Sequence, residues 1–254
     1  MCVFADLSGR TIVVTGGTSG IGRAIALEVA TAGANILVHG TREPSAAVDI
    51  CEAIRRQGRQ CWYERCDFRQ QDTWVDFVSR VYDRCGPVHG WVNGAGVDLL
   101  TGTGSQWDYG TKLRALLDVD VAATVQLSKI VGERMRVAGS GVILNIGWDQ
   151  ADRGMEGDSA ELFSVAKNAV MGFTRSLAVS LAPQVRVNCI APGWIKTAWG
   201  ERASDDWQQR VLRETPLNRW GTPEDIAKLA RFLLSDDASY ITGQIINANG
   251  GAVR

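Results

Sequence analysis

Three closely spaced glycines stand near the start of the chain, in the segment TIVVTGGTSGIGRAIALEVATAGA. The segment reads as a strand, a glycine turn at Gly16, Gly20 and Gly22, and an amphipathic helix. Glycines permit positive φ angles and let the backbone approach a phosphate closely at the start of a helix. A plain glycine-rich turn would have the same spacing. Because this turn lies in the first of several strand–helix units, we interpret it as a dinucleotide-binding turn.

The end of the next apolar run indicates which dinucleotide is preferred. An NAD-selective site usually ends this strand with Asp or Glu, whose carboxylate binds the ribose 2′-hydroxyl. Here the run NILVH is followed by Gly40, Thr41 and Arg42. A hydroxyl and a guanidinium suit a 2′-phosphate, which a carboxylate would repel. We therefore favour NADP(H) over NAD(H) as the cofactor, the alternative being that Arg42 is a solvated loop residue.

The apolar pattern predicts the scaffold that positions these groups. Short β-rich runs alternate along the whole chain with segments of helical spacing. The runs lie at residues 11–15, 35–39, 89–93, 142–146, 185–190 and 244–248. Runs that are apolar on both faces and separated by helices indicate an α/β fold, a doubly wound parallel sheet (Rossmann fold) with helices on both faces. We expect one domain over residues 1–254, with 149–161 as a loop.

Composition and charge exclude several classes of function. The chain has 254 residues, 45% of them hydrophobic and 22% charged, and a formal net charge of −1. Without a cluster of Lys or Arg it lacks the electrostatic footprint of a protein that binds nucleic acid or an anionic membrane. Its apolar runs are short and MCVFADLSGR does not read as a signal peptide, so we expect a soluble cytoplasmic protein. Six cysteines without a CxxC pair, and only two histidines, predict no metal site.

The aromatic residues limit the acid–base chemistry of this chain. It contains nine Trp but only four Tyr, and the two histidines are His39 and His89. Catalysis by a histidine base is therefore nearly excluded. Any tyrosine chemistry must use one of the residues at positions 63, 82, 109 and 240.

Further motifs occur in order along the chain: TGGTSGIG (15–22), CDF (66–68), NGAG (93–96), AKNAVMGFTRSLA (166–178), VRVNCIAPGWIKT (185–197) and SYITGQIINANGG (239–251). With these motifs the chain resembles the short-chain dehydrogenase/reductase family, close to its β-ketoacyl-ACP-reductase-like branch. The resemblance implies that Asp67 binds the adenine and Lys167 the ribose. Together with the glycine turn and the end of the second strand, the cofactor-binding residues are then Gly16, Thr18, Ser19, Gly20, Ile21, Gly22, Thr41, Arg42, Asp67, Phe68, Asn93, Gly94, Ala95, Lys167, Pro192, Gly193, Ile195 and Thr197.

The catalytic positions depart from the family pattern. The family uses Asn, Ser, Tyr and Lys, the last two spaced YxxxK, and its Tyr donates a proton to the carbonyl oxygen as hydride arrives. In this alignment Lys167 is in place, but Phe163 stands at the Tyr position and Trp148 at the Ser position. Asp120 stands where the Asn belongs. We take Lys167 and Asp120 as the catalytic candidates, acting either as a plain salt bridge or as a new acid–base pair.

These replacements make ordinary ketone reduction unexpected. A positioned general acid contributes about 10²–10⁴-fold to a rate. A donor to a developing oxyanion contributes about 10²–10³-fold. Trp148 and Phe163 supply apolar bulk instead, so an alkoxide forming there would be desolvated without a partner.

The segments expected to border the substrate pocket are rich in tryptophan and in acidic residues. The tryptophans are Trp148, Trp194, Trp199 and Trp207, and the acids after Trp148 are Asp149, Asp152, Glu156, Asp158 and Glu161. One interpretation is a filled pocket beside a solvated acidic face. The other is an aromatic wall with an acidic rim, which favours a cationic or flat small molecule.

Three hypotheses follow for the function. The first is an NADP-dependent oxidoreductase whose acceptor, such as an imine or iminium, needs no tyrosine acid. The second is an inactive NADP-binding sensor, or an inert subunit of a family oligomer. The third is non-redox chemistry in the remodelled pocket. The resemblance also implies a homotetramer packed through the helix that carries Lys167 and the C-terminal strand.

Overall fold

A parallel sheet forms the centre of the molecule. The computed structural model describes residues 3–253 of the chain. Among these residues the strand order is β3-β2-β1-β4-β5-β6-β7, and every neighbouring pair is parallel. The strands are β1 (Thr11–Thr15), β2 (Asn35–Gly40), β3 (Cys61–Arg65), β4 (Gly90–Asn93), β5 (Gly141–Ile146), β6 (Val185–Pro192) and β7 (Ile245–Ala248). The predicted α/β class, a doubly wound parallel sheet, is confirmed.

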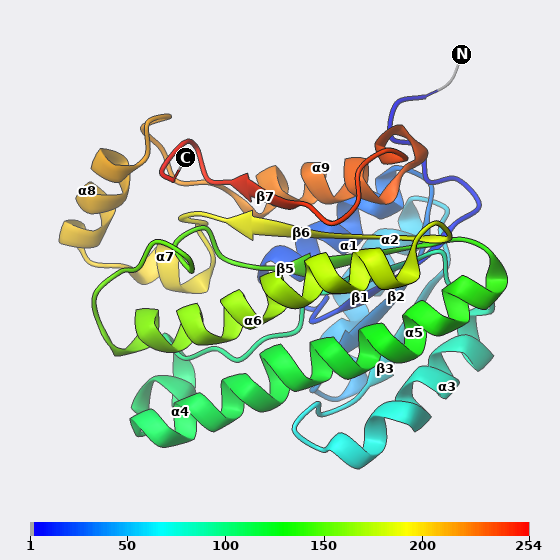
Figure 1. Cartoon of the computed structure of the whole chain (residues 1–254), viewed down its shortest axis with the longest axis horizontal. Coiled ribbons are helices and arrows are strands. Elements are labelled where there is room, and N and C mark those ends of the chain that lie inside the picture. The colour runs from blue at the N-terminus through cyan, green and yellow to red at the C-terminus, as the bar shows by residue number, and fades with distance from the viewer. Residues whose placement is uncertain (1–2, 254) are drawn as a thin grey trace.

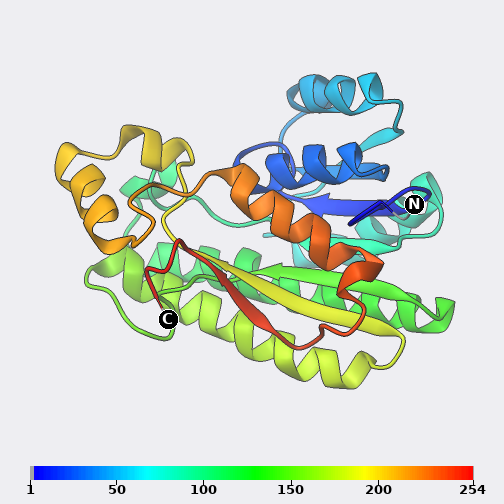
Figure 2. The ribbon, with the colours of Figure 1, turned by 90° about the horizontal axis from the view of Figure 1, so that it is seen from above.

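Helices cover both faces of this sheet, as Figure 2 shows. One face carries α1 (Gly20–Thr31), α2 (Val48–Arg56) and α9 (Pro223–Leu234). The other carries α3 (Trp74–Cys85), α5 (Thr124–Ala138) and α6 (Asp158–Leu181), and α4 (Tyr109–Leu116) packs on α6. The short helices α7 (Ala198–Arg202) and α8 (Asp205–Glu214) lie beyond the carboxyl ends of the strands, toward which β6 and β7 point in Figure 1.

The side chains of β1 explain why its middle residues are all apolar. Ile12 and Val14 pack in the core beneath α1, α2 and α9, whereas Val13 packs on the opposite face against α3 and α5. Successive side chains of a strand point to opposite faces, so a strand covered by helices on both sides does not alternate between apolar and polar residues. All five of its residues are buried.

Strand β3 was not predicted from the sequence. Its segment CWYER lies at the edge of the sheet and ends in two charged residues, Glu64 and Arg65. Glu64 is nevertheless buried, because Arg84 and Arg80 of α3 reach it at 3.0 and 3.4 Å. A buried charge needs such partners, and they come from another element. Because these partners are distant in the sequence, the residues of CWYER themselves did not predict a buried strand.

The predicted loop at 149–161 is shorter than expected. It ends at Gly157, and Asp158 and Glu161 lie in the first turn of α6. Acidic side chains are favoured there by the helix dipole. None of the helices in residues 3–253 combines the length and apolarity needed to cross a membrane.

Candidate functional site

The turn between β1 and α1 brings several backbone segments unusually close together. Gly16 has a φ of +65°, and a Cβ there would lie 2.6 Å from the carbonyl oxygen of Gly94. A Cβ at Gly22 would lie 2.3 Å from the carbonyl oxygen of Gly16. The N-cap residue Ser19 makes no side-chain hydrogen bond to the helix. The first N–H groups of α1 are thus open to an anion such as a pyrophosphate.

His39 anchors this turn, a role that the sequence did not reveal. Its Nδ1 accepts a hydrogen bond from the Gly16 N–H (3.2 Å), and its carbonyl oxygen accepts one from Gly17 N–H (3.0 Å). Its Nε2 lies 3.0 Å from the carbonyl oxygen of Cys66. Burial lowers the pKa of His39 to about 4, so the ring is neutral and donates to Cys66 through Nε2. A polar residue in an otherwise apolar strand was the only signal for this role.

The end of β2 presents a hydroxyl and a cationic group to the same space. Thr41 and Arg42 line the cleft described below, and Tyr63 Oη donates a hydrogen bond to the Arg42 carbonyl oxygen (2.6 Å). Glu43, the next residue, pairs with Arg65 rather than with Arg42. The Arg42 guanidinium therefore keeps its capacity to bind a phosphate.

Asp67 follows β3, and its carboxylate is paired. Arg69 Nη2 lies 2.6 Å from Asp67 Oδ2, and the hydrogen bonds from Arg69 hold the Asp67 pKa below its usual range. Both residues line the cleft on the side where the resemblance expects the adenine.

One large cleft of about 970 Å³ lies at the carboxyl ends of the strands. It is lined by every predicted cofactor-binding residue except Gly20 and Asn93, and by Asp120, Trp148 and Phe163. Gly20 instead begins α1. Residues from six strand ends are thus brought together around one space, as the topology of a doubly wound sheet requires.

Asn93 is part of a buried polar network and not of the cleft wall. Its Nδ2 donates to Ser128 Oγ (2.8 Å) and to Asn145 Oδ1 (2.7 Å), and its Oδ1 accepts from Trp91 Nε1 (2.8 Å). These bonds tie β4 to β5 and α5. The side chain of Asn93 therefore has a structural role, and its contact with the cofactor stays a prediction.

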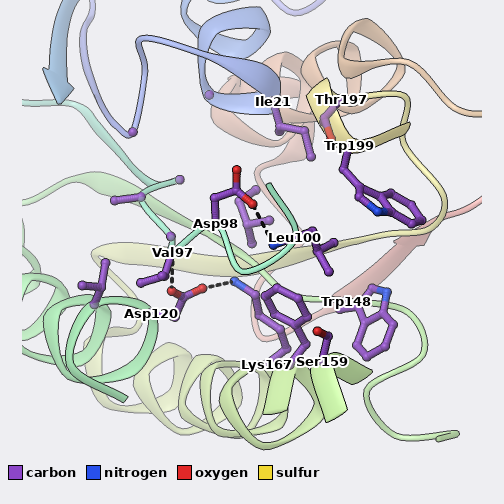
Figure 3. Close-up of a pocket in the computed structure, with 18 of the residues that line it drawn as sticks. Ile21, Val97, Asp98, Leu100, Asp120, Trp148, Ser159, Lys167, Thr197 and Trp199 are labelled. Carbon is purple, nitrogen blue, oxygen red and sulfur yellow. Dashed lines mark hydrogen bonds and ion pairs between the residues drawn. The ribbon is translucent and has the colours of Figure 1, made fainter. Parts of the chain in front are cut away.

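Lys167 and Asp120 form an ion pair at the floor of the cleft (Figure 3). Lys167 Nζ lies 2.9 Å from Asp120 Oδ2, and Asp120 Oδ1 accepts a hydrogen bond from the Val97 N–H at 2.9 Å. The Asp120 side chain is only 2% exposed. It lies on a π-helical segment, Leu117–Ala123, between α4 and α5, and such segments are frequent at functional sites.

Two aromatic rings line the same cleft as this ion pair. The Trp148 and Phe163 rings meet edge to face with centroids 6.3 Å apart. Among the described residues that line the cleft there is no tyrosine, and the Tyr109 hydroxyl donates instead to Glu161 (3.2 Å). Among the described residues, the cleft that contains Lys167 is thus lined by these two rings and by no phenol.

Ser159 is a further cleft residue that sequence reasoning missed. It precedes Phe163 by four positions and Lys167 by eight, so all three lie on one face of α6. Ser159 lines the same cleft as Trp148 and Phe163, and Figure 3 draws its hydroxyl on α6. Its signal in the sequence was the four-residue spacing alone.

The outer wall of the cleft is a cluster of tryptophans from the α7–α8 region. The Trp207 ring centroid lies 5.4 Å from that of Trp194 and 5.5 Å from that of Trp199. Trp220 packs behind Trp199 at 5.9 Å. Three of these rings line the cleft, which makes this wall a broad aromatic surface.

The acidic loop does not form an open negative rim. Of its five acids only Glu156 and Asp158 line the cleft, and Arg210 of α8 pairs with Glu156 at 2.6 Å. The same guanidinium lies 4.7 Å above the Trp207 ring, so it joins α8 to the loop. Glu161 accepts the hydrogen bond from Tyr109. The structure therefore favours the aromatic wall over the acidic rim.

Asp149, next to Trp148, is buried beside the C-terminal segment. Its Oδ2 accepts a hydrogen bond from Asn249 Nδ2 (3.0 Å), whereas its Oδ1 is buried without a partner. Burial raises the pKa of Asp149 to about 6. The folded protein therefore binds this proton more tightly than the unfolded chain, whose aspartates titrate near 3.9.

Replacing Asp149 with asparagine is expected to stabilise the protein above pH 6 by about 2 kcal/mol. The stability that the raised pKa provides is fully present below pH 4 and is lost as the pH rises through about 6. Urea unfolding at pH 4.5 and pH 8 measures the difference between the two proteins. Asp152→Asn, which changes an exposed acid of the same loop, is the control. Equal gains at both pH values would contradict the assignment.

The fold and the cleft define a class of protein, the dinucleotide-binding oxidoreductases with a Rossmann-type sheet. The family model described as "Enoyl-(Acyl carrier protein) reductase" matches residues 16–253. The 3-oxoacyl-[acyl-carrier-protein] reductase FabG of Aquifex aeolicus is 33% identical over 250 residues, which cover 96% of this chain and 98% of that protein. The chain belongs to the short-chain dehydrogenase/reductase family.

Two solved structures of dehydrogenases are similar to this chain in both fold and sequence. One is a putative NAD(P)-dependent gluconate 5-dehydrogenase from Beutenbergia cavernae with bound NADP, at a TM-score of 0.86 and 33% identity over 98% of both chains. The other is a 7α-hydroxysteroid dehydrogenase in complex with NADH and 7-oxo glycochenodeoxycholic acid, at a TM-score of 0.88 and 31% identity over 98% of this chain and 96% of that chain. Within residues 3–253 no cluster of His, Cys, Asp or Glu is arranged to hold a metal ion.

Proposed function

We propose that this protein is an NADP(H)-dependent reductase whose acceptor is already activated, such as an imine or iminium. The observation that carries the proposal is the floor of the cleft. An ion pair between Lys167 and Asp120 is intact there, while Trp148 and Phe163 occupy the positions of the family's proton and hydrogen-bond donors. This arrangement supports a cleft that keeps its cofactor part and lacks the family's acid.

The cofactor half of the cleft fits a dinucleotide. A Cβ at Gly16 or Gly22 would clash with a backbone carbonyl oxygen, so the turn needs glycine at both positions, and the open start of α1 attracts a pyrophosphate. Arg42 suits the 2′-phosphate, and Lys167 suits the ribose hydroxyls. A bound reduced nicotinamide supplies hydride at the cleft.

An iminium acceptor matches the chemistry of the remaining groups. When hydride adds to its carbon, the C=N electron pair moves to nitrogen and neutralises the positive charge, so no proton donor is needed. The faces of Trp148, Trp194 and Trp199 attract a cation. Lys167 does not repel such a cation strongly, because Asp120 compensates its charge at 2.9 Å.

Replacing Arg42 with alanine is expected to weaken NADPH binding about 10–100-fold and to leave NADH binding nearly unchanged. A hydrogen bond to a charged group contributes about 1.5–3 kcal/mol, and only NADPH carries the 2′-phosphate. Titration with energy transfer from tryptophan to the reduced nicotinamide gives both Kd values. Arg56→Ala, an exposed arginine of α2 outside the cleft, is the matched control. An equal loss for both cofactors would refute the role of Arg42.

The reaction is tested by following NADPH oxidation with a panel of cyclic imines and a panel of ketones. Turnover of imines without turnover of ketones supports the proposal. Tight NADPH binding without turnover on either panel supports the alternative, an NADP-binding sensor or inert subunit. Product formation that is independent of cofactor supports non-redox chemistry. Failure to bind either cofactor would exclude the first two functions.

We propose a homotetramer that packs through α6 and β7. Two valines of α6, Val165 and Val179, are 52% and 81% exposed, although valine is usually buried in a monomer. Exposed apolar residues on a long helix suit a contact between two copies. Light scattering of the purified protein measures the assembly.

A further inference from the structure

Two thiols lie against each other at the edge of the sheet, outside the cleft. Cys51 is on α2 and Cys61 is the first residue of β3, and their Sγ atoms are 2.9 Å apart. A disulfide bond has an S–S separation of about 2.0 Å, so the two sulfur atoms need to approach by only about 1 Å to bond. Neither residue is among those that line the cleft.

The two thiols differ in character although they touch. The Cys61 thiol donates a hydrogen bond to Cys51 Sγ, and this bond, helped by the charge of Arg55, lowers the pKa of Cys51 to about 7. The same hydrogen bond and burial raise the pKa of Cys61. Cys51 is therefore the thiolate of the pair, and the thiolate is the reactive form of cysteine.

The other described cysteines have no thiol partner. Cys66 Sγ contacts the Thr73 hydroxyl at 3.3 Å, and the Cys85 thiol donates to the Val81 carbonyl oxygen at 3.0 Å. Burial raises the pKa of Cys189 to about 12. Contact between two sulfur atoms is thus confined, among residues 3–253, to Cys51 and Cys61.

We propose that Cys51 and Cys61 form a redox-active pair that a hydroperoxide converts to a disulfide. The Cys51 thiolate attacks a peroxide oxygen, the O–O bond breaks, and a sulfenic acid and hydroxide (or alkoxide) result. The Cys61 sulfur then attacks the Cys51 sulfur, forms the S–S bond and releases water. Two electrons pass from the thiols to the peroxide. Only 5% of Cys51 and 4% of Cys61 is exposed, so the oxidant must be as small as a hydroperoxide to reach the sulfur atoms.

The bond would fasten α2 to the edge strand of the sheet. The segment from Arg42 to Cys61 runs through α2, and Tyr63, two residues farther along β3, holds the Arg42 carbonyl oxygen. Closing the short loop between the two cysteines reduces the freedom of the unfolded chain. We expect the Tm of the oxidised protein to exceed that of the reduced protein by on the order of 5 °C.

The test treats the reduced full-length protein with hydrogen peroxide and digests it with trypsin without reduction. Cleavage after Arg55, Arg56 and Arg59 puts Cys51 and Cys61 in separate peptides. The expected result is one disulfide-linked peptide pair and the loss of two of the six thiols to a thiol reagent in denaturant. Cys51→Ser is expected to abolish the linked pair, whereas Cys66→Ser, at the other end of β3, retains it.

Several results would overturn the proposal. One is sulfinic acid on Cys51 without any linked peptides, and another is linkage spread equally over all cysteines. If the isolated protein already contains the Cys51–Cys61 disulfide, a reductant must break it and peroxide must form it again. Failure of peroxide to re-form the disulfide would also contradict the proposal. Because the readout is a peptide mass and needs neither cofactor nor substrate, it is independent of the proposed reductase function.

Discussion

The variant with Trp148→Ser and Phe163→Tyr is expected to reduce ketones at least about 10²-fold faster than the natural protein. A tyrosine at position 163 would place a phenol one helical turn before Lys167, on the same face of α6. A serine at position 148 removes an indole that meets the Phe163 ring at 6.3 Å and adds a donor for the substrate oxygen. A positioned general acid alone contributes about 10²–10⁴-fold.

NADPH-dependent reduction of a panel of small ketones measures this gain, and each single variant serves as a control. Phe163→Tyr alone is expected to gain little, because the Trp148 indole, which meets the ring at position 163 edge to face, still stands where the family has a hydrogen-bond donor. The two effects are not additive, since both donors act on one oxygen. A double variant that folds and binds NADPH like the natural protein, yet reduces no ketone, would show that more than these two side chains is missing.

Replacing Lys167 with methionine is expected to lower the free energy of unfolding by about 3–5 kcal/mol. The change leaves the Asp120 carboxylate with a single remaining hydrogen bond, from Val97 N–H, in a place where its side chain is 2% exposed. An unpaired buried charge is among the most costly defects in a protein. Asp120→Asn is expected to cost only about 1 kcal/mol, because it keeps an acceptor for Val97 and leaves Lys167 open to the cleft.

The double variant with both changes completes a thermodynamic cycle. It is expected to be more stable than Lys167→Met alone, because it contains no uncompensated charge. Chemical denaturation of the four proteins at pH 7 gives the coupling between the two positions. Purely additive losses would mean that the ion pair contributes nothing to folding.

The sequence was sufficient for the architecture wherever the local pattern and the tertiary contacts agree. Strand β1 and the glycine turn were predicted because both faces of β1 are buried and the turn needs glycine at Gly16 and Gly22. Strand β3 was missed because the arginines that compensate Glu64 come from α3. Such partners are visible only once the chain is folded.

The sequence predicted most of the residues that line the cleft, but it predicted the contacts of their side chains less well. Lys167 and Asp120 were expected near each other from their places in the family pattern, and the structure brings them to 2.9 Å. The side chain of Asn93 lies in a buried network with Asn145, which its place in the NGAG motif did not indicate. The sequence pattern predicts a solvated acidic loop for Asp149, but Asn249, one hundred positions later, holds it in the interior. Side-chain direction and distant partners decide such cases, and neither has a local signature.

Hydride transfer to an activated acceptor is tested most directly with NADPH that carries deuterium at the transferable position of its nicotinamide. The protein is incubated with this cofactor and a cyclic iminium salt, and the product amine is examined by mass spectrometry and NMR. We predict one deuterium on the carbon next to nitrogen, formed at a rate that needs no added acid. An amine without deuterium, or no amine at all under conditions where NADPH is bound, would contradict the proposed function.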